Sequence, residues 1–193
     1  MSNNDALDLR PETSGLALID IQERLAAAMP PDVLNVALKN VHTLLEIARR
    51  LGLPVAVTEQ YPKGLGRTLP VVAEELLKFP KGHVELFEKV EFDSTAVDPW
   101  MKFVEVTGRK QWIVVGMEAH VCVYQSVRGM VDRGLSVHVP RDAVTSRTKS
   151  NWKTGLLLCD RAGGLVTSTE IVLFDLLKQA GTDEFRALSK LVR

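Results

Sequence analysis

The feature that most constrains the fold is the alternation of short apolar runs with longer amphipathic segments along the chain. Each apolar run is consistent with a buried strand, and the segments between them place apolar residues at helical spacing. A chain in which helices alternate with strands builds a parallel sheet with helices on both faces. We therefore predict a doubly wound, three-layer α/β/α fold with six strands, at residues 15–21, 54–58, 84–88, 112–116, 135–139 and, more weakly, 165–167.

Local signals mark several element boundaries. Asp32 follows two prolines and is the expected N-cap of a helix that ends at Gly52. Residues 59–70 contain two glycines and two prolines, which predicts a loop. The helical spacing predicts helices at residues 32–50, 71–78, 99–106, 121–133, 153–162 and 169–179.

Length and charge narrow the function classes. We expect residues 1–193 to form one domain, with residues 1–14 as a polar N-terminal extension. Lys plus Arg and Asp plus Glu both number 24, so we expect neither nucleic acid nor a membrane surface as a partner. A net charge of zero leaves little charge repulsion between copies of the chain, which is compatible with oligomerisation. The start lacks a signal-peptide pattern and the two cysteines form no framework, so we expect a cytoplasmic protein with reduced thiols.

Three chemically reactive residues follow the predicted strands. Asp20 ends the first strand, Lys89 follows the third, and Cys122 lies just beyond the fourth, where a helix is expected to begin. Ligands in open parallel sheets bind beyond the carboxyl ends of the strands. Taken singly, Asp20 is also consistent with a turn cap, Lys89 with a solvated lysine and Cys122 with a small buried hydrophobe. Their shared edge favours a site.

The three side chains together suit nucleophilic catalysis. A thiol loses its proton more readily at a helix N-terminus and beside a cation, which predicts a lowered pKa for Cys122 next to Lys89. Asp20 would take the thiol proton and return a proton to a leaving amine. Backbone N–H groups at a helix start would bind an oxyanion. By contrast, Cys159 lies on an apolar helical stripe, where core packing and a less reactive thiol are expected.

Several motifs resemble those of the isochorismatase-like cysteine hydrolases. Residues 116–126, Gly-Met-Glu-Ala-His-Val-Cys-Val-Tyr-Gln-Ser, are similar to the nucleophile motif of that superfamily, and residues 18–22 resemble its first-strand Asp-x-Gln signature. Glu88-Lys89 followed by Phe92-Asp93-Ser94 resembles its lysine segment. The likeness runs from about residue 15 to residue 177, and the 58–66 loop is similar to that of the small isochorismatase-domain hydrolases.

The resemblance implies several properties. It implies a six-stranded parallel sheet, cysteine-based hydrolysis that is commonly of amides, and assembly as dimers to octamers. It also implies a cis peptide at Met117–Glu118, with the backbone N–H groups of Glu118 and Cys122 as oxyanion donors. Family nicotinamidases hold a metal through an Asp-x-His cluster in the loop after the second strand, but residues 59–67 contain no histidine. We therefore expect neither a metal nor a cofactor, and the presence of Cys122 disfavours vinyl-ether cleavage.

Other residues are weighed for a substrate pocket. His120 lies two residues before Cys122, and we favour a structural or pocket-wall role over that of a general base. His42, His83 and His138 show no metal spacing. A pocket above Cys122 is expected to be lined by Gln22, Tyr61, Leu65, Phe92 and Tyr124.

The sequence thus predicts a cysteine-dependent hydrolase that cleaves a small amide-like substrate through a thioester acyl-enzyme. Two other classes stay open at this stage. One is a non-catalytic oligomeric binding or scaffold protein on the same fold. The other is a redox-responsive thiol protein, since a reactive thiol is also prone to oxidation.

Overall fold

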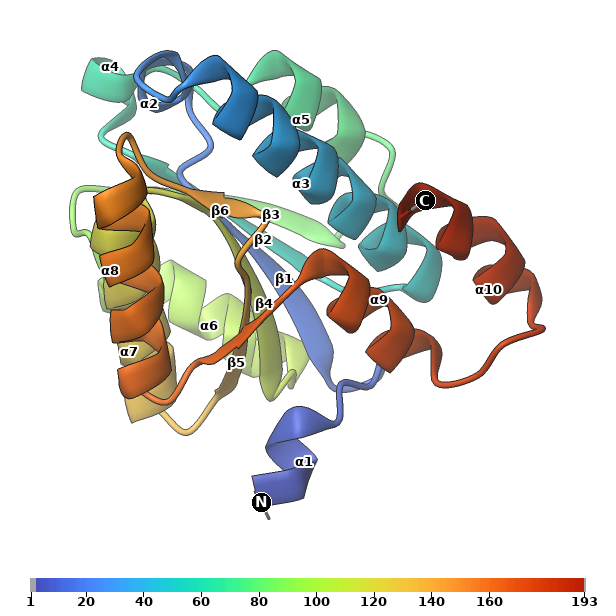
Figure 1. The fold of residues 1–193 in the computed structure, drawn as a ribbon. Coiled ribbons are helices and arrows are strands. Elements are labelled where there is room, and N and C mark those ends of the chain that lie inside the picture. The colour runs from blue at the N-terminus through green and yellow to red at the C-terminus, as the bar shows by residue number, and fades with distance from the viewer. Residues whose placement is uncertain (1–2, 193) are drawn as a thin grey trace.

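The sheet is parallel throughout and its strand order is β3-β2-β1-β4-β5-β7, with β6 paired to the carboxyl end of β4 (Figure 1). This computed structural model describes residues 3–192. The predicted α/β/α class is confirmed, and the six predicted strands form the main path of the sheet. The strands are β1 Ser14–Ile19, β2 Val55–Gln60, β3 Val84–Lys89, β4 Gln111–Met117, β5 Ser136–Pro140, β6 Val144–Thr145 and β7 Leu165–Thr167.

Helices cover both faces of the sheet (Figure 1). One layer contains α3 Pro31–Leu51, α5 Pro70–Leu76, α9 Thr169–Leu177 and α10 Asp183–Leu188; the other contains α6 Asp98–Thr107, α7 Tyr124–Asp132 and α8 Lys149–Arg161. Shorter helical segments lie in the connections: α1 Asn3–Leu7, α2 Glu23–Ala27, α4 Pro62–Leu65, η1 Ser94–Ala96, η2 Ala119–Val123 and η3 Ser189–Val192.

The central strands are buried on both faces. Every residue of β1, β2 and β4 is buried, which explains why the sequence is mostly apolar in β1, in β4 and in the first half of β2. Leu16, Leu18 and Ile113 pack under α3, while Trp112 packs on the opposite face against Trp100, with ring centroids 5.8 Å apart. Burial on this scale supplies most of the stabilisation, at about 25 cal/mol per Å² of apolar surface. It holds the strand ends in fixed positions.

The N-terminal segment is part of the packed structure rather than a free extension. Leu9 is fully buried. The Gln111 side-chain amide donates to the carbonyl oxygens of Asp5 and Asp8 at 3.1 and 2.8 Å, and His138 Nε2 lies 2.9 Å from the carbonyl oxygen of Ala6. Backbone carbonyls thus tie the segment that we expected to be a polar N-terminal extension to β4 and β5. Residues 1 and 2 lie outside the described part of the chain.

Other boundaries also differ from the sequence predictions. Asp32 is not the N-cap: α3 begins at Pro31, and Asp32 lies in its first turn. Gly52 ends that helix as predicted, with φ at 70°. The predicted helix 153–162 begins at Lys149, because the Thr148 hydroxyl caps it by accepting from the backbone N–H of Asn151 at 3.2 Å. Within residues 3–192, no helix is long and apolar enough to span a membrane.

Candidate active site

The strand order explains how Asp20, Lys89 and Cys122 come together. β1 and β3 flank β2, and β4 lies on the other side of β1, so the carboxyl ends of all four strands share one edge. Asp20 is the first residue after β1, Lys89 is the last residue of β3, and Cys122 lies in η2 just after β4. Asp20 adopts a left-handed backbone conformation with φ at 51°, which aspartate tolerates better than most residues.

Asp20 and Lys89 form a buried ion pair. Lys89 Nζ lies 2.7 Å from Asp20 Oδ2, and both side chains are completely shielded from solvent. The hydroxyl of Thr58 donates to the other carboxylate oxygen, Oδ1, at 2.6 Å. Each oxygen of Asp20 thus has a protein donor, as a buried charge requires.

Lys89 reaches Asp20 across β2, and β2 contributes to both ends of the pair. Thr58 donates to Asp20, while Gln60 accepts from Lys89 Nζ at 2.7 Å through its Oε1. Lys89 Nζ also lies 3.3 Å from the carbonyl oxygen of Glu91 and 3.5 Å from that of Phe92. Thr58 and Gln60 lie in the 58–66 loop but are not among the site residues predicted from the sequence. The available signal is that both are polar and two residues apart in the second half of β2, so they face the same side of the sheet.

The thiol of Cys122 faces this pair in a buried environment. Cys122 is 4% exposed. Burial raises the pKa of the Cys122 thiol; the charge of Asp20 and a hydrogen bond to its carboxylate raise it further, and Lys89 lowers it. The prediction of a lowered pKa is therefore corrected. The physical reason is that Cys122 lies inside a buried π-helical turn ahead of α7, where desolvation and Asp20 outweigh the cation.

Cys159 lies elsewhere. It is fully buried on α8 within the apolar core, as its helical stripe predicts. Burial raises the pKa of the Cys159 thiol to about 12. The main difference between the two cysteines is therefore in the charged groups around them.

Glu118 connects β4 to the thiol-bearing turn. The Met117–Glu118 peptide is cis, which confirms the geometry implied by the resemblance. The Glu118 carboxylate accepts from the Nε of Arg147 at 3.1 Å to each oxygen and from the backbone N–H of Arg147 at 3.0 Å. The backbone N–H groups of Glu118 and Cys122, which the resemblance implies as oxyanion donors, thus lie in one turn, and Arg147 binds the Glu118 side chain of that turn.

The residues expected to line the pocket are in different environments. Gln22 is completely buried, and its amide binds backbone: Oε1 accepts from Gln60 N at 2.8 Å, and Nε2 donates to Gly66 O at 2.7 Å and Gln60 O at 3.1 Å. It therefore anchors the 60–66 segment in this structure. Tyr61 and Phe92 are about half exposed, at 54% and 49%. Leu65 and Tyr124 are partly buried, and Arg128 lies over the Tyr124 ring, 5.4 Å from its centroid.

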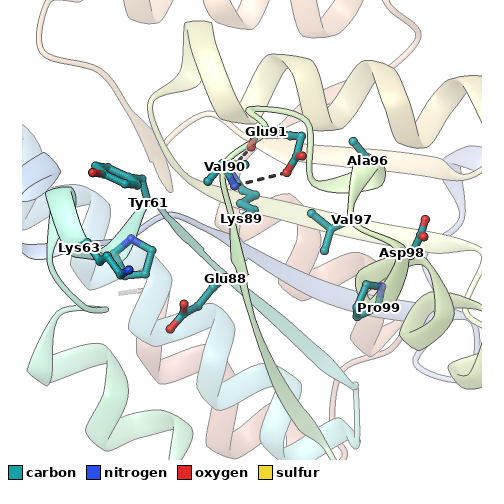
Figure 2. A pocket seen from close by; sticks show the side chains of 11 residues that line it. Tyr61, Lys63, Glu88, Lys89, Val90, Glu91, Ala96, Val97, Asp98 and Pro99 are labelled. Atoms are coloured by element: carbon teal, nitrogen blue, oxygen red, sulfur yellow. Dashed lines mark hydrogen bonds between the residues drawn. The ribbon is translucent and has the colours of Figure 1, made fainter.

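A cavity of about 490 Å³ opens beside the end of β3 (Figure 2). Figure 2 shows Tyr61 and Lys63 on one side of the strand that ends at Lys89, and the segment from Ala96 to Pro99 on the other. Of the five predicted pocket residues, Tyr61 lines this cavity. Its lining includes Lys89 but neither Asp20 nor Cys122, so the described residues shield the thiol from it.

The remaining candidates have structural contacts. His120 Nδ1 lies 3.1 Å from the hydroxyl of Ser146, which is consistent with the structural role favoured from the sequence. Glu59 faces away from Asp20; its carboxylate accepts from Thr68 N at 2.7 Å and binds Arg67 at 2.9 Å. Among residues 3–192 no group of three His, Cys, Asp or Glu side chains is arranged to hold a metal ion.

Taken together, these features define a parallel α/β protein with a buried Asp–Lys–Cys cluster at the carboxyl edge of its sheet. The model of the isochorismatase domain matches residues 14–171. The chain therefore belongs to the isochorismatase family, a family of hydrolases.

Relatives and solved structures agree with this membership. The chain is 33% identical over 188 residues to the secreted isochorismatase effector Isc1 of Phytophthora sojae, covering 96% of this chain and 87% of that protein. A structure described as MAR1 ribonuclease from Caenorhabditis elegans superposes with a TM-score of 0.86 at 32% identity, covering 95% of this chain and 91% of the other. The YcaC gene product of Escherichia coli, described as an octameric hydrolase of unknown specificity, has a TM-score of 0.83 at 20% identity, covering 95% and 90%; at this identity the likeness shows the fold alone.

Proposed function

We propose that the protein is a cysteine hydrolase that cleaves the C–N bond of a small amide-like substrate through a thioester acyl-enzyme. The observation that carries this proposal is the buried Asp20 carboxylate, which contacts Lys89 and Thr58 and raises the pKa of the neighbouring Cys122 thiol through its charge and a hydrogen bond. A nucleophile, a proton acceptor and a cation thus meet at one place, which is the arrangement that nucleophilic acyl transfer needs.

The reaction begins with proton transfer from Cys122 to Asp20 as the sulfur attacks the substrate carbonyl carbon. The carbonyl π electrons move to oxygen, and the backbone N–H groups of Glu118 and Cys122 bind the oxyanion. When the tetrahedral intermediate collapses, the C–N bond breaks and Asp20 gives its proton to the departing amine. A water molecule then attacks the thioester while Asp20 takes a proton from it. The C–S bond then breaks, Asp20 returns its proton to the sulfur, and the carboxylic acid leaves.

The raised pKa of the Cys122 thiol supports a specific order of events. A thiol that keeps its proton at neutral pH is a poor nucleophile until a base takes that proton. Asp20 is hydrogen-bonded to it, so proton transfer can accompany attack. Lys89 then stabilises the negative charge that develops on sulfur. In this scheme the resting enzyme holds a neutral thiol rather than a thiolate.

The experiment that tests the proposal is a screen of small amides, ureides and carbamates for ammonia release, run with the wild type and Cys122→Ala in parallel. We expect hydrolysis of at least one compound by the wild type and none by the variant. Single-stranded RNA belongs in the same panel because the C. elegans structure carries a ribonuclease name. Activity that survives Cys122→Ala, on an amide or on RNA, would overturn the proposal.

Three further properties are proposed with this function. Residues 1–193 form one domain, supported by the single sheet and its two helical layers in the described residues. The protein acts without a metal or cofactor, so dialysis against a chelator leaves its activity unchanged. It assembles as a homo-oligomer in the cytoplasm; sedimentation of the purified protein and fractionation of cells test these two points, and a monomer or a secreted protein would contradict them.

A further inference from the structure

Gln60 lies where two parts of the site meet. It is the last residue of β2, and the sheet register places it directly beside Lys89 on β3. Its side-chain oxygen accepts from Lys89 Nζ at 2.7 Å, and its side-chain nitrogen donates to the carbonyl oxygen of Val90 at 2.7 Å. Its backbone N–H donates to the buried amide of Gln22. Gln60 is 6% exposed, so these contacts form in a largely dry environment.

The donors of Lys89 are all directed at protein groups. An ammonium group has three N–H bonds and no acceptor. One faces Asp20 at 2.7 Å, one faces Gln60 at 2.7 Å, and the third has only the carbonyl oxygens of Glu91 and Phe92 at 3.3 and 3.5 Å. The strong contacts of Lys89 are therefore one carboxylate and one neutral amide.

The neutrality of that second acceptor matters for the thiol. The charged groups that face Cys122 are Asp20 after β1, Lys89 on β3 and Glu118 ahead of η2. Of these, only Lys89 favours the thiolate. An amide oxygen holds the ammonium group in place without adding a negative charge, whereas a carboxylate at the same position would oppose the charge that develops on sulfur.

We propose that Gln60 is a positioning residue of the hydrolase, which acts through Lys89 by holding its ammonium group between Asp20 and the 90–92 segment without neutralising it. This inference rests on the proposed function of Cys122 and Lys89. Gln60 contacts neither the thiol nor, in the proposed mechanism, the substrate.

Two isosteric variants separate position from charge. Gln60→Met removes the acceptor, so Lys89 loses one of its two short contacts. Gln60→Glu keeps an acceptor of the same size and adds a charge. Asn40→Leu serves as the control, because it removes a side-chain donor to a backbone carbonyl oxygen, that of Asp142 at 2.9 Å, and Asn40 is not among the groups that shift the pKa of the Cys122 thiol. All variants are made in a Cys159→Ala background so that Cys122 is the one cysteine that iodoacetamide can alkylate.

The first measurement is the rate of Cys122 alkylation by iodoacetamide across pH. Below the thiol's pKa, the rate follows the thiolate fraction. We expect Gln60→Glu to lower this rate about tenfold or more at a given pH, the effect of raising the pKa by about one unit. Asn40→Leu should leave it unchanged. Because Glu has the size of Gln, a change in access does not explain such a shift.

The second measurement is kcat and KM on a compound from the amide screen. Both Gln60 variants should lower kcat about tenfold or more while KM stays within about twofold, because Lys89 acts on the developing charge. Folded Gln60 variants with wild-type alkylation rates and kcat would overturn the proposal, leaving Gln60 a purely structural residue. If Cys122→Ala stays active, the proposed function fails, yet the alkylation profile still reports whether Gln60 controls the charge near the thiol.

Discussion

The surroundings of Cys122 and Cys159 are alike in how deeply they bury the thiol but differ in the charged groups they contain. Both cysteines are at most 4% exposed, and burial is the main factor that raises the pKa of each thiol. Around Cys159, packed in the core on α8, no charged side chain contributes to that shift. Around Cys122, by contrast, Asp20 and Glu118 raise the pKa and Lys89 lowers it.

The comparison teaches that a raised pKa alone does not distinguish an inert thiol from a candidate nucleophile. What distinguishes Cys122 is a hydrogen-bonded carboxylate and a neighbouring cation, which in the proposed mechanism take the thiol proton and stabilise the charge on sulfur. Cys159 has neither. If this is the relevant difference, removing the charges around Cys122 should make the two thiols behave alike.

The largest effect is expected from removing the thiols one at a time. Cys122→Ala should lower kcat by about 10³-fold or more, because the covalent route is lost. Cys159→Ala should keep kcat within a few-fold and cost about 1–2 kcal/mol of unfolding free energy through the small cavity left in the core. Steady-state kinetics and urea denaturation measure the two effects. Equal losses of kcat in the two variants would show that the charged groups around Cys122 do not distinguish its role from that of Cys159.

Breaking the ion pair is expected to have the next largest effect. Lys89→Met leaves the fully buried Asp20 carboxylate without its cation and should reduce the unfolding free energy by about 3–5 kcal/mol. The double variant Asp20→Asn/Lys89→Met removes both charges and should recover much of that loss. Urea denaturation at neutral pH measures both. A double variant no more stable than Lys89→Met would show that burial of the lone carboxylate is not the cause.

Thiol reactivity tests the charge difference directly. Because the pKa of each thiol is raised, iodoacetamide should label both slowly at neutral pH, and the rates should rise as the pH increases toward the pKa values. Lys89→Met should slow the labelling of Cys122 by about tenfold and leave Cys159 unchanged. Peptide mapping by mass spectrometry separates the two rates. Rapid labelling of Cys122 at neutral pH would instead support the lowered pKa that was predicted for this thiol from the sequence.

The smallest effect is expected from Thr58→Val, which is nearly isosteric. It removes the 2.6 Å hydrogen bond to Asp20 Oδ1 and leaves the contact with Lys89 intact. We expect a loss of about 1.5–3 kcal/mol in unfolding free energy, the range for a hydrogen bond to a charged group. A fall in kcat of about tenfold should accompany it. Thr43→Val, on α3 away from the thiol, is the matched control; equal effects on kcat would argue against a specific role for Thr58.

Much of the fold follows from periodicity, because long buried strands such as β1 and β4 produce continuous apolar runs in the sequence. The short elements could not be predicted in this way. β6 has two residues and α4 has four, about one period each, so neither is long enough for a pattern to repeat. The attachment of the N-terminal segment has no such pattern either, because it depends on backbone carbonyls that Gln111 and His138 bind from distant strands.

The meeting of Asp20, Lys89 and Cys122 could be predicted because strand ends in a parallel sheet share an edge. The contacts of Thr58 with Asp20 and of Gln60 with Lys89 could not be predicted, because they depend on β2 lying between β1 and β3. The thiol's pKa was predicted in the wrong direction for a related reason. A sequence shows which charges are nearby but not how completely a side chain is desolvated, and for Cys122 desolvation is the larger effect.

The central claim is that Cys122 carries the acyl group during turnover. Its most direct test is rapid acid quenching of the wild type mixed with an amide found by the screen, followed by intact-protein and peptide mass spectrometry. The account predicts a transient mass increase equal to the acyl group, mapped to Cys122, absent in Cys122→Ala and reversed by hydroxylamine. The claim would be contradicted if the enzyme turned over that amide but no adduct appeared even under conditions that slow hydrolysis of the acyl-enzyme. An adduct on a residue other than Cys122 would contradict it as well.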